Sequence, residues 1–496
     1  MTNLAQHLSD TAEQFPDHPA IILDDLSLSY REVEAAAKQL SAWLVEHGVT
    51  PGDRVAVMLP NLPPFPVIYY GALRAGAIVV PMNPLFKRRE IEHYLSDSGA
   101  STIFAMPSEE VEAAAEATGA ELVPVGADGL SGLLDGVEPT DAMVDRGDDD
   151  TAVILYTSGT TGRPKGAELT HHNLNSNQAS TAQTLLHLDE QDVVMGCLPL
   201  FHVFGMTCGM NSAFACGAAL TLIPRFDPAK ALEVIERDKV TVFEGVPTMY
   251  GAMLAAAGHA EQVPDLSSLR TAVSGGSSMP VEVLRTFEEA FSCVILEGYG
   301  LSETSPVASF NHPDADRKPG SIGTPIRGVE MMLLDVEGNE AAEGEIGEIA
   351  IRGENIMAGY WANEDASAEA IVDGWFRSGD LARRDSDGYY EIVDRKKDMI
   401  IRGGMNIYPR EIEEVLYEHS AVAEAAVVGV PHDEYGEEVA AYVVIAEGAE
   451  ATEDELREHV KAQVAAYKYP REVHLIPELP KGATGKILKR ELGKDK

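Results

Sequence analysis

The peptide TSGTTGRPKGA, residues 157–167, contains three glycines, four hydroxyl side chains and two cations in eleven residues. It follows AVILY at 152–156, an apolar run typical of a buried strand, and precedes a polar segment from Thr170 that is expected to be helical. Glycines let the backbone turn tightly and expose its N–H groups, while the hydroxyls and Lys165 add donors and positive charge. A loop with this composition at the end of a strand is suited to holding phosphate oxygens.

This loop differs from a Walker A loop. A Walker A sequence would end in Gly-Lys-Ser or Gly-Lys-Thr, whereas this chain has Pro164-Lys165-Gly166. A flexible surface turn is the alternative interpretation, but such turns rarely combine so many donors with a preceding core strand.

The composition indicates a multidomain globular protein, because 496 residues with 45% hydrophobic content can form two or three cores. The net charge of -42, from 80 acidic against 38 basic residues, excludes a nucleic-acid partner. The acidic residues are spread along the chain, as in cytoplasmic proteins of salt-loving microbes, where high ionic strength screens the repulsion between like charges. A halophilic host is therefore our hypothesis.

The sequence also predicts a cytoplasmic protein without a membrane anchor, either a monomer or a homodimer. The N-terminus has no basic and apolar leader pattern, and Arg74 interrupts the apolar stretch 69–82 before it reaches spanning length. The cysteines show no C-x-x-C spacing and are expected to be buried free thiols. They are Cys197, Cys208, Cys216 and Cys293.

Most of the chain alternates apolar strands, small-residue turns and helices, which predicts mostly parallel sheets covered by helices. Ser29 and Glu32 have capping-box spacing, and the apolar periodicity that follows predicts a helix over about 30–47. Donor-rich turns at 158–166, 274–278 and 298–303 each follow a predicted strand. Open α/β sheets bind ligands at this end of their strands.

The pattern changes near residue 320 to one typical of an antiparallel ribbon. Asp385, Asp387 and Gly388 lack the ligand spacing of a calcium loop and are expected to form a hairpin turn. The last hundred residues predict a compact α+β unit, with a helix from Pro409 and another opened by Thr452. We expect an α/β N-terminal domain that includes a β ribbon or barrel part (1–394), a hinge (395–397) and a smaller mobile α+β C-terminal domain (398–496).

Seven motifs occur in order along nearly the whole chain, and together they resemble the adenylate-forming, acyl-activating superfamily of AMP-binding enzymes. The segment 82–100, the segment 320–331 and the C-terminal part are most similar to fatty acyl-CoA synthetases. The motifs are TSGTTGRPKG, PLFHVFG, SGGSSMP, EGYGLSET, RSGDLA, DRKKDMIIRGG and PKGATGK.

The resemblance implies a two-step reaction. A carboxylate attacks the α-phosphorus of MgATP to give acyl-AMP and pyrophosphate, and a thiol such as that of coenzyme A then displaces AMP. Two negatively charged reactants must meet, so positioning and electrostatics dominate the catalysis. ATP, Mg²⁺ and coenzyme A are the expected cofactors and co-substrates, with a carboxylic acid as the further substrate.

The resemblance also assigns roles to residues of this sequence. Lys486 would bridge the attacking carboxylate and the α-phosphate, and Glu303 would ligate Mg²⁺. Asp380 would accept hydrogen bonds from the ribose hydroxyls, assisted by Arg395. The residues implied in ATP and AMP binding are Thr157, Ser158, Gly159, Thr160, Thr161, Gly162, Lys165, Gly275, Gly276, Ser277, Glu297, Gly298, Tyr299, Gly300, Ser302, Asp380 and Arg395.

Two further roles depend on a rotation of the small domain between its adenylating and thioester-forming poses. Lys397 matches the family's hinge position, and Gly403 with Gly404 would line the pantetheine tunnel in the second pose. Arg402, Lys468 and Arg471 are candidate contacts for the CoA nucleotide.

The predicted acyl pocket begins at His202, which matches a position where family members place an aromatic side chain and which we also count among the catalytic candidates. An ordinary core histidine is the alternative. FHVFG carries no Asp to pair with an α-ammonium group, so an amino-acid substrate is disfavoured. The neighbouring wall is expected to be apolar, which favours a monocarboxylic acid with an apolar tail. Its candidates are Phe204, Gly205, Met206, Val246 and Pro247.

The leading hypothesis is an acid:CoA ligase for medium- to long-chain fatty acids. An aryl acid of the benzoate or coumarate type would use the same chemistry, and an acyl-AMP ligase could load a separate carrier protein instead of CoA. A non-catalytic nucleotide-binding regulator would require loss of a reactive group, whereas Lys486, Glu303 and Asp380 are all present.

Overall fold

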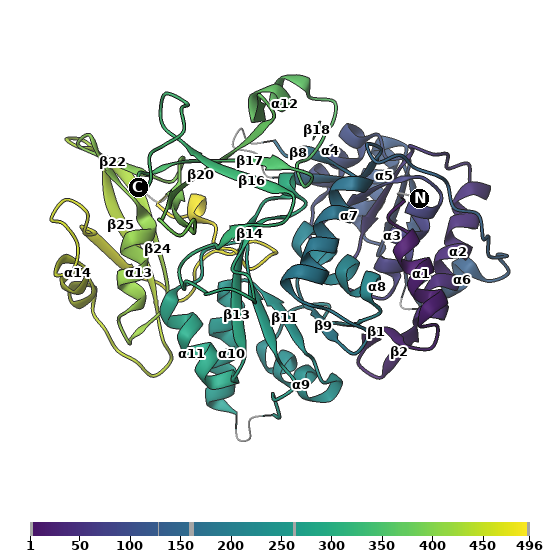
Figure 1. Cartoon of the computed structure of the whole chain (residues 1–496), viewed down its shortest axis with the longest axis horizontal. Coiled ribbons are helices and arrows are strands. Elements are labelled where there is room, and N and C mark those ends of the chain that lie inside the picture. The colour runs from purple at the N-terminus through teal and green to yellow at the C-terminus, as the bar shows by residue number, and fades with distance from the viewer. Residues whose placement is uncertain (1–2, 127, 158–162, 261–263, 494–496) are drawn as a thin grey trace.

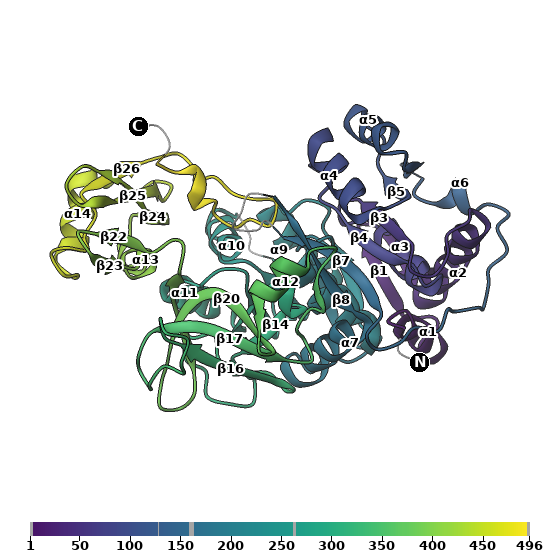
Figure 2. The ribbon, with the colours of Figure 1, turned by 90° about the horizontal axis from the view of Figure 1, so that it is seen from above.

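The structure is a computed structural model that describes residues 3–126, 128–157, 163–260 and 264–493. A large body holds most of the chain, and a smaller C-terminal lobe lies at one side of it (Figures 1 and 2). The chain then leaves the lobe and returns toward the body, as the yellow segment shows in both views. The boundaries 394 and 398 between the two parts stay a prediction.

The largest sheet has nine strands, of which the central six are parallel and the outer ones antiparallel. Parallel neighbours need crossover connections, which the helices of the body supply. Across the sheet the strands are β15 (Thr324–Pro325), β14 (Val307–Phe310), β13 (Val294–Gly300), β12 (Thr271–Ser274), β11 (Val242–Gly245), β9 (Val193–Gly196), β10 (Ala219–Leu222), β1 (Pro19–Leu23) and β2 (Leu26–Ser29).

A second, seven-stranded sheet carries the opening peptide between two of its strands. The peptide leaves the end of a strand, as predicted, but that strand pairs in antiparallel register with the segment 165–170, which the sequence pattern did not identify as a strand. Across this sheet the strands are β18 (Gly359–Tyr360), β8 (Lys165–Thr170), β7 (Thr151–Thr157), β4 (Ile78–Pro81), β3 (Arg54–Met58), β5 (Thr102–Ala105) and β6 (Glu121–Pro124).

Helices cover both sheets and fill the space between them. The helix α2 (Tyr30–Glu46) is where the capping box predicts it, because Ser29 and Glu32 exchange the two capping hydrogen bonds. The remaining helices of the body are α1 (Gln6–Gln14), α3 (Pro64–Arg74), α4 (Arg88–Ser98), α5 (Glu109–Thr118), α6 (Ser131–Leu134), α7 (His171–Ser180), η1 (Thr181–Leu185), η2 (Phe204–Asn211), α8 (Ser212–Cys216), α9 (Pro228–Asp238), α10 (Pro247–His259), α11 (Val281–Phe291), η3 (Ser302–Thr304) and α12 (Glu364–Ala370).

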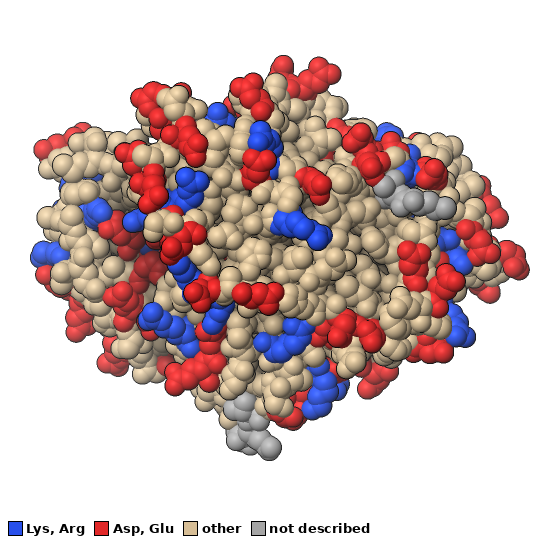
Figure 3. All heavy atoms as spheres, in the orientation of Figure 1, with Lys and Arg blue, Asp and Glu red and all other residues tan. Residues whose placement is uncertain are grey.

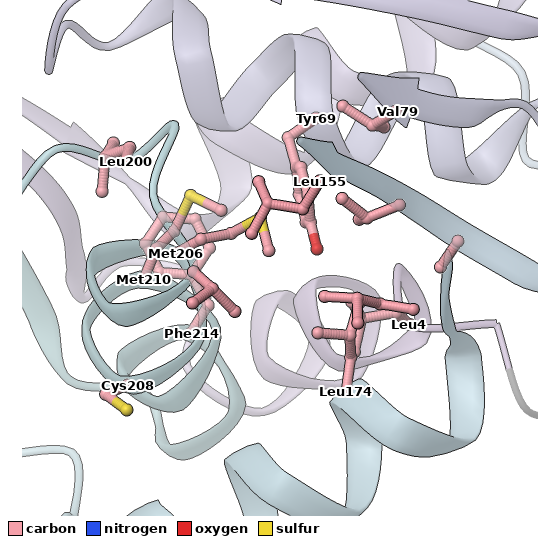
Figure 4. Packing of buried hydrophobic residues seen from close by; sticks show 14 of the residues in the cluster. Leu4, Tyr69, Val79, Leu155, Leu174, Leu200, Met206, Cys208, Met210 and Phe214 are labelled. Carbon is pink, nitrogen blue, oxygen red and sulfur yellow. The ribbon is translucent and has the colours of Figure 1, made fainter. Parts of the chain in front are cut away.

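Three apolar clusters hold the layers of the body together. The largest joins the two sheets through α2, α3, α7, η2 and α8, and Figure 4 shows Met206, Met210 and Phe214 of this cluster gathered near Tyr69. A second cluster packs α9, α10 and α11 on the far face of the nine-stranded sheet, and a third packs α4 and α5 on the far face of the other. Each sheet is therefore buried on both faces, as parallel sheets require.

The antiparallel ribbon predicted after residue 320 forms a five-stranded sheet. Asp385 makes the expected hairpin turn, since its side chain accepts from the backbone N–H groups of Asp387 and Tyr389. Nζ of Lys318 lies 2.5 Å from the Asp385 carboxylate and 2.6 Å from that of Asp387. The positive charge in this acidic turn is therefore the lysine ammonium group. The strands are β16 (Val329–Leu334), β17 (Gly347–Gly353), β19 (Ile371–Val372), β20 (Trp375–Arg384) and β21 (Tyr390–Arg395).

The C-terminal lobe has its own sheet and its own core, which confirms the smaller α+β unit. Helix α14 begins with the capping box of Thr452 and Glu455 that the sequence indicates. The lobe contains β22 (Ile400–Arg402), β23 (Met405–Ile407), α13 (Pro409–Tyr417), β24 (Val422–His432), β25 (Gly436–Ile445), α14 (Glu453–Lys461), β26 (Glu472–Leu475) and η4 (Lys489–Glu491).

Acidic side chains are dispersed over the face of the molecule seen in Figure 3, with basic side chains between them. The four cysteines form no disulfides, and three of them are buried while Cys216 is partly exposed. None of the helices within the described residues combines the length and apolar character that crossing a bilayer requires.

Candidate active site

A cleft of about 2670 Å³ lies between the body and the returning C-terminal segment. It gathers most of the residues that the sequence implicates, although they are spread over more than three hundred positions. These are Thr157, Lys165, His202, Phe204, Val246, Pro247, Gly275, Gly276, Ser277, Glu297, Gly298, Tyr299, Gly300, Ser302, Glu303, Asp380, Arg395, Lys397 and Lys486. Ser158, Gly159, Thr160, Thr161 and Gly162 lie outside the described residues.

The parallel strands β12 and β13 place their carboxyl ends at this cleft, as the positions of the donor-rich turns that follow them predict. The neighbouring parallel strand β11 also ends there, although the sequence predicts no donor-rich turn after it. Gly276 turns the chain after β12 with a φ of +79°, which favours glycine. At Gly300 a Cβ atom would lie 1.9 Å from the backbone oxygen of Pro306, so only glycine lets the two segments approach.

Tyr299, Asp380 and Arg395 form one polar group, joined by a hydrogen bond and an ion pair. The Tyr299 hydroxyl donates to Oδ2 of Asp380 at 2.6 Å, and Nε of Arg395 lies 3.3 Å from Oδ1. Asp380 and Arg395 are directly paired across β20 and β21, which fixes their contact. Burial and the neighbouring Asp380 carboxylate hold the pKa of Tyr299 well above its ordinary value, so its hydroxyl remains a donor. A carboxylate held in this way can accept from a pair of hydroxyl groups.

Glu303 is the centre of a second polar group. Its Oε1 accepts from the hydroxyls of Thr157 at 3.3 Å and Tyr360 at 2.9 Å. Nζ of Lys165 lies 4.8 Å from the centre of the Tyr360 ring. One carboxylate beside hydroxyl groups fits Mg²⁺, which is usually held by one or two carboxylates together with substrate phosphates. No cluster of three or more metal-ligating side chains occurs within the described part of the chain.

Glu297, which the sequence implicates in nucleotide binding, lines the cleft but is almost fully buried. Its Oε1 accepts from the backbone N–H of Met279 at 3.0 Å, which ties the turn after β12 to β13. Burial, partly offset by the Arg410 guanidinium, raises the pKa of Glu297 to about 7.

Lys486 reaches the cleft on a tight turn of the returning segment. The turn is closed by backbone hydrogen bonds from Gly482 to Lys486 and from Gly485 to Gly482. The hydroxyl of Thr248, on α10 of the body, donates to the backbone oxygen of Gly485 at 3.0 Å. Gly485 has a φ of +78°, and a Cβ atom there would lie 3.0 Å from Val246. A larger residue at 485 would therefore strain the turn that carries the lysine.

The surroundings of Lys486 disfavour its charged form while the cleft holds no anion. Burial and the Arg395 cation lower its pKa to about 7, against the opposing effect of the Asp380 and Asp398 carboxylates. Burial and the nearby Lys486 ammonium likewise lower the pKa of His202 to about 4, so this imidazole is neutral at pH 7. An anionic substrate would restore the ammonium form of Lys486.

The part of the cleft that the sequence predicts to hold the acyl group has the apolar residues Phe204 and Val246 in its wall. The Nδ1 atom of His202 accepts from the backbone N–H of Phe204 at 3.3 Å, which orients the ring. Met206 is a correction to the sequence analysis, because it packs in the core between the sheets and does not line the cleft. Gly205 does not line the cleft either, and a Cβ there would lie 2.6 Å from the backbone oxygen of Pro199.

The residues assigned to the hinge and the tunnel lie on the lobe side. Lys397 is exposed and follows β21 at the edge of the cleft. Gly403 and Gly404 form the turn between β22 and β23 with positive φ angles, away from the cleft lining in this pose. The CoA-nucleotide candidates all have partners: Arg402 pairs with Glu438, Lys468 with Glu411, and Arg471 lies over the ring of Tyr469.

Three residues of the cleft were missed in the sequence. Tyr360 and Thr248 lie in no motif identified in the sequence. Tyr360 contacts Glu303, 57 positions away, and Thr248 contacts Gly485, 237 positions away. Glu244 did carry a signal, since it is the single charge in the otherwise apolar run TVFEGVP at 241–247.

Comparison with known proteins identifies the family. The model of the AMP-binding enzyme family matches residues 8–361, and that of the AMP-binding enzyme C-terminal domain matches residues 411–486. A long-chain-fatty-acid–CoA ligase of Bacillus subtilis is 39% identical over 98% of this chain and 93% of its own length. A feruloyl-CoA synthase of an Amycolatopsis species is 40% identical over 97% and 96%. ATP-bound MatB from Rhodopseudomonas palustris superposes with a TM-score of 0.93 at 33% identity, covering 99% of this chain and 98% of MatB.

Proposed function

The chain belongs to the AMP-binding enzyme family, as an acyl- or aryl-CoA ligase, and from this premise we propose that it activates a medium- to long-chain fatty acid through an acyl-adenylate. The observation that carries this proposal is the convergence of Lys486, Asp380 and Glu303 on one cleft from three separate segments.

In the first step the substrate carboxylate attacks the α-phosphorus of ATP, forming the acyl–phosphate bond and releasing pyrophosphate. The ammonium group of Lys486 lies between the two anionic reactants and offsets their repulsion, which is greatest in the transition state. A pKa of about 7 leaves the free lysine only partly charged near neutral pH, and the bound anions would favour its ammonium form. The backbone turn and the Thr248 hydrogen bond hold the lysine in position.

Asp380 and Arg395 orient the nucleotide in this proposal. Tyr299 donates to Oδ2 of Asp380. The ribose hydroxyls donate to the acceptor positions of this carboxylate that Tyr299 does not occupy. The Tyr299 ring lies against the adenine, beside the turn formed by 275–277. Thr157 and Lys165 flank the loop that holds the β- and γ-phosphates, and Glu303 would hold the Mg²⁺ that neutralises them.

A fatty acid is the leading substrate because the described acyl wall is mostly apolar and the Bacillus subtilis relative is a long-chain-fatty-acid–CoA ligase. An aryl acid is the second candidate, favoured by a feruloyl-CoA synthase of similar identity. A panel of fatty acids of increasing length and of benzoates and cinnamates, with acid- and CoA-dependent AMP release as the readout, separates the two. Activity with aryl acids alone would overturn the leading proposal.

We propose coenzyme A as the acceptor, reached by rotation of residues 398–496 about Lys397, with Gly403 and Gly404 lining the tunnel in the second pose. Replacing Lys397 with Pro should stall thioester formation while leaving acyl-AMP formation measurable. CoA is compared with a phosphopantetheinyl carrier protein as acceptor in the same assay. Transfer to the carrier alone would favour the acyl-AMP ligase alternative, and ATP binding without acid-dependent pyrophosphate release would favour a regulator.

We further propose that the protein works in the cytoplasm of a salt-adapted host, because its net charge of -42 needs screening. The expected result is an unfolding temperature that rises from low to molar KCl. An unchanged unfolding temperature would contradict this proposal without affecting the assignment of the reaction.

A further inference from the structure

Glu244 is a buried carboxyl group on the acyl side of the cleft. It lies on β11, whose residues alternate between the two faces of the nine-stranded sheet. Val242 packs in the cluster between the sheets, and Phe243 packs in the cluster on the opposite face. Glu244 shares the face of Val242, and only 1% of its surface is exposed. An acidic side chain is thus inserted into an apolar layer.

This carboxyl group has an oxygen without a partner. Its Oε1 is buried and accepts no hydrogen bond from any described residue. On the helix η2 that faces it, a Cβ atom at Gly209 would lie 3.1 Å from Oε2. Burying a polar group without a partner is unfavourable, so such a group in a native structure needs an explanation.

The side chain borders the cleft in which the acyl group is proposed to lie. Thr181, Leu186 and Cys208 line the same cleft together with Glu244, at its end toward η1 and η2. Figure 4 shows Cys208 on the side of its helix away from Met206 and Met210, although all three belong to the same buried cluster. The cleft is continuous from this end to His202 and Lys486.

Other roles fit this position less well. Glu244 takes part in no ion pair within the described residues, and it belongs to no cluster that could hold a metal ion. Burial raises its pKa to about 8, so the group is mostly protonated at pH 7 and can both donate and accept a hydrogen bond. A neutral carboxyl group matches a hydroxyl better than it matches an ammonium or a second carboxylate.

We propose that Glu244 is a specificity-determining residue that hydrogen-bonds a hydroxyl group of the acyl chain, so that the enzyme prefers a hydroxylated carboxylic acid to the unsubstituted acid. This inference rests on the proposed acid:CoA ligase function and narrows its substrate class. A site built around a buried polar group discriminates strongly against an analogue that leaves this group unpaired. Binding the hydroxyl supplies a partner to a carboxyl group that has none within the described residues.

The test measures kcat/KM for pairs of acids that differ only in the hydroxyl. Hexadecanoic acid is compared with hydroxyhexadecanoic acids substituted at successive positions along the chain, and cinnamic acid with its ring-hydroxylated analogues. At least one hydroxylated acid is expected to exceed its unsubstituted partner by about tenfold or more. If every unsubstituted acid equals or exceeds its hydroxylated partners, the inference is overturned.

Two substitutions assign the preference to this side chain. Glu244→Gln keeps a hydrogen-bonding group of the same size and should retain most of the preference, whereas Glu244→Leu should abolish or reverse it. An unchanged preference in Glu244→Leu overturns the inference. Thermal unfolding checks that each variant is folded, and Glu244→Met, a more flexible apolar replacement, substitutes for Leu if that variant is not.

The same experiment separates this inference from the proposed function. If no acid in the panel supports AMP release or thioester formation with any form of the enzyme, the ligase proposal itself fails. If the acids are instead activated with the same kcat/KM ratio between hydroxylated and unsubstituted partners in the wild type and in Glu244→Leu, only the role of Glu244 fails.

Discussion

The two sides of the cleft differ in how their polar groups are satisfied. On the nucleotide side, the carboxylates of Asp380 and Glu303 each have partners within the protein, at distances between 2.6 and 3.3 Å. On the acyl side, Glu244 stands in an apolar wall with its Oε1 unpartnered. Asp380 and Glu303 are therefore oriented before a ligand arrives, whereas Glu244 has no partner within the described residues that would orient it. Glu297 is intermediate, because its Oε1 accepts a hydrogen bond while its buried Oε2 has no partner in the described part of the chain.

This difference corresponds to a division of tasks. In the proposed function, the nucleotide side carries out chemistry that does not depend on the acid, so its groups can be fixed in advance by packing and by hydrogen bonds. The acyl side must distinguish one acid from another, and one buried polar group in an apolar pocket provides strong discrimination. Substitutions on the nucleotide side should therefore affect all acids equally, and those on the acyl side should change their ranking.

The largest effect is expected at Lys486. Replacing it with Ala should lower the rate of acyl-AMP formation by about 10³-fold for every acid, because the charge that offsets two anions is lost. The measurement is acid-dependent pyrophosphate release in the absence of CoA.

The matched control for Lys486→Ala supplies the intermediate directly. Thioester formation from added acyl-AMP and CoA should be nearly unchanged, since this lysine is proposed to act in the first step only. An equal loss in both steps would contradict the proposed role of Lys486.

Asp380→Ala should have the next largest effect, a reduction of about 10- to 100-fold in kcat/KM for ATP. The substitution removes the acceptor for the ribose and leaves Tyr299 and Arg395 without their shared partner. Asp380→Asn, which keeps an acceptor oxygen, should lose less. If the loss differed between fatty acids of different length, the separation between the two sides of the cleft would be wrong.

The pH dependence of the first step tests the electrostatics at Lys486. Its pKa of about 7 lies below the ordinary value of 10.5, so the ammonium fraction of the free enzyme falls about tenfold for each pH unit above 7. We therefore expect kcat/KM for adenylation to decline above about pH 7, with a smaller decline in kcat because the bound anions restore the charge. The Lys486→Arg variant should be less active, but its guanidinium group stays charged over this pH range. Its kcat/KM for adenylation should therefore not change with pH above about 7. A flat wild-type profile would contradict the prediction.

The smallest effect is expected on stability, at Glu244. Its pKa is about 8 in the folded protein and ordinarily 4.5, so between these values the folded state keeps a proton that the unfolded state releases. Stability therefore falls as the pH rises through this window. Glu244→Gln removes this dependence, and its unfolding temperature relative to the wild type should increase from pH 5 to pH 8. A constant difference would show that the carboxyl group is not desolvated in the folded protein.

Much of the architecture could be predicted because local rules determine it. The capping box at Ser29 sets the start of α2, and small residues after the apolar strands β12 and β13 place two of the predicted turns at one edge of the nine-stranded sheet. The third predicted turn follows β7 of the seven-stranded sheet. The strand β8 was missed because its pattern is polar and its pairing with β7 and the two-residue β18 depends on tertiary contacts. That pairing also places Tyr360 beside Glu303, a contact that no local pattern indicates.

The candidate site divides in the same way. The nucleotide-side residues occur in motifs that the sequence shows directly, whereas the acyl wall depends on which face of each element turns inward. Met206 and Cys208 are two residues apart on η2, yet only Cys208 lines the cleft. The π-helical winding of this segment differs from the α-helical period that sequence patterns assume, so its inward face could not be read from spacing alone.

The cysteines offer an experimental advantage for following the lobe. Cys197, Cys208 and Cys293 are buried, and burial raises the pKa of the partly exposed Cys216 to about 11, so it reacts slowly with maleimides at neutral pH. A single cysteine introduced on an exposed position of the lobe and another on the body could therefore carry fluorophores with little background labelling. Energy transfer between them would test whether residues 398–496 rotate during turnover, as proposed, without first removing the native thiols.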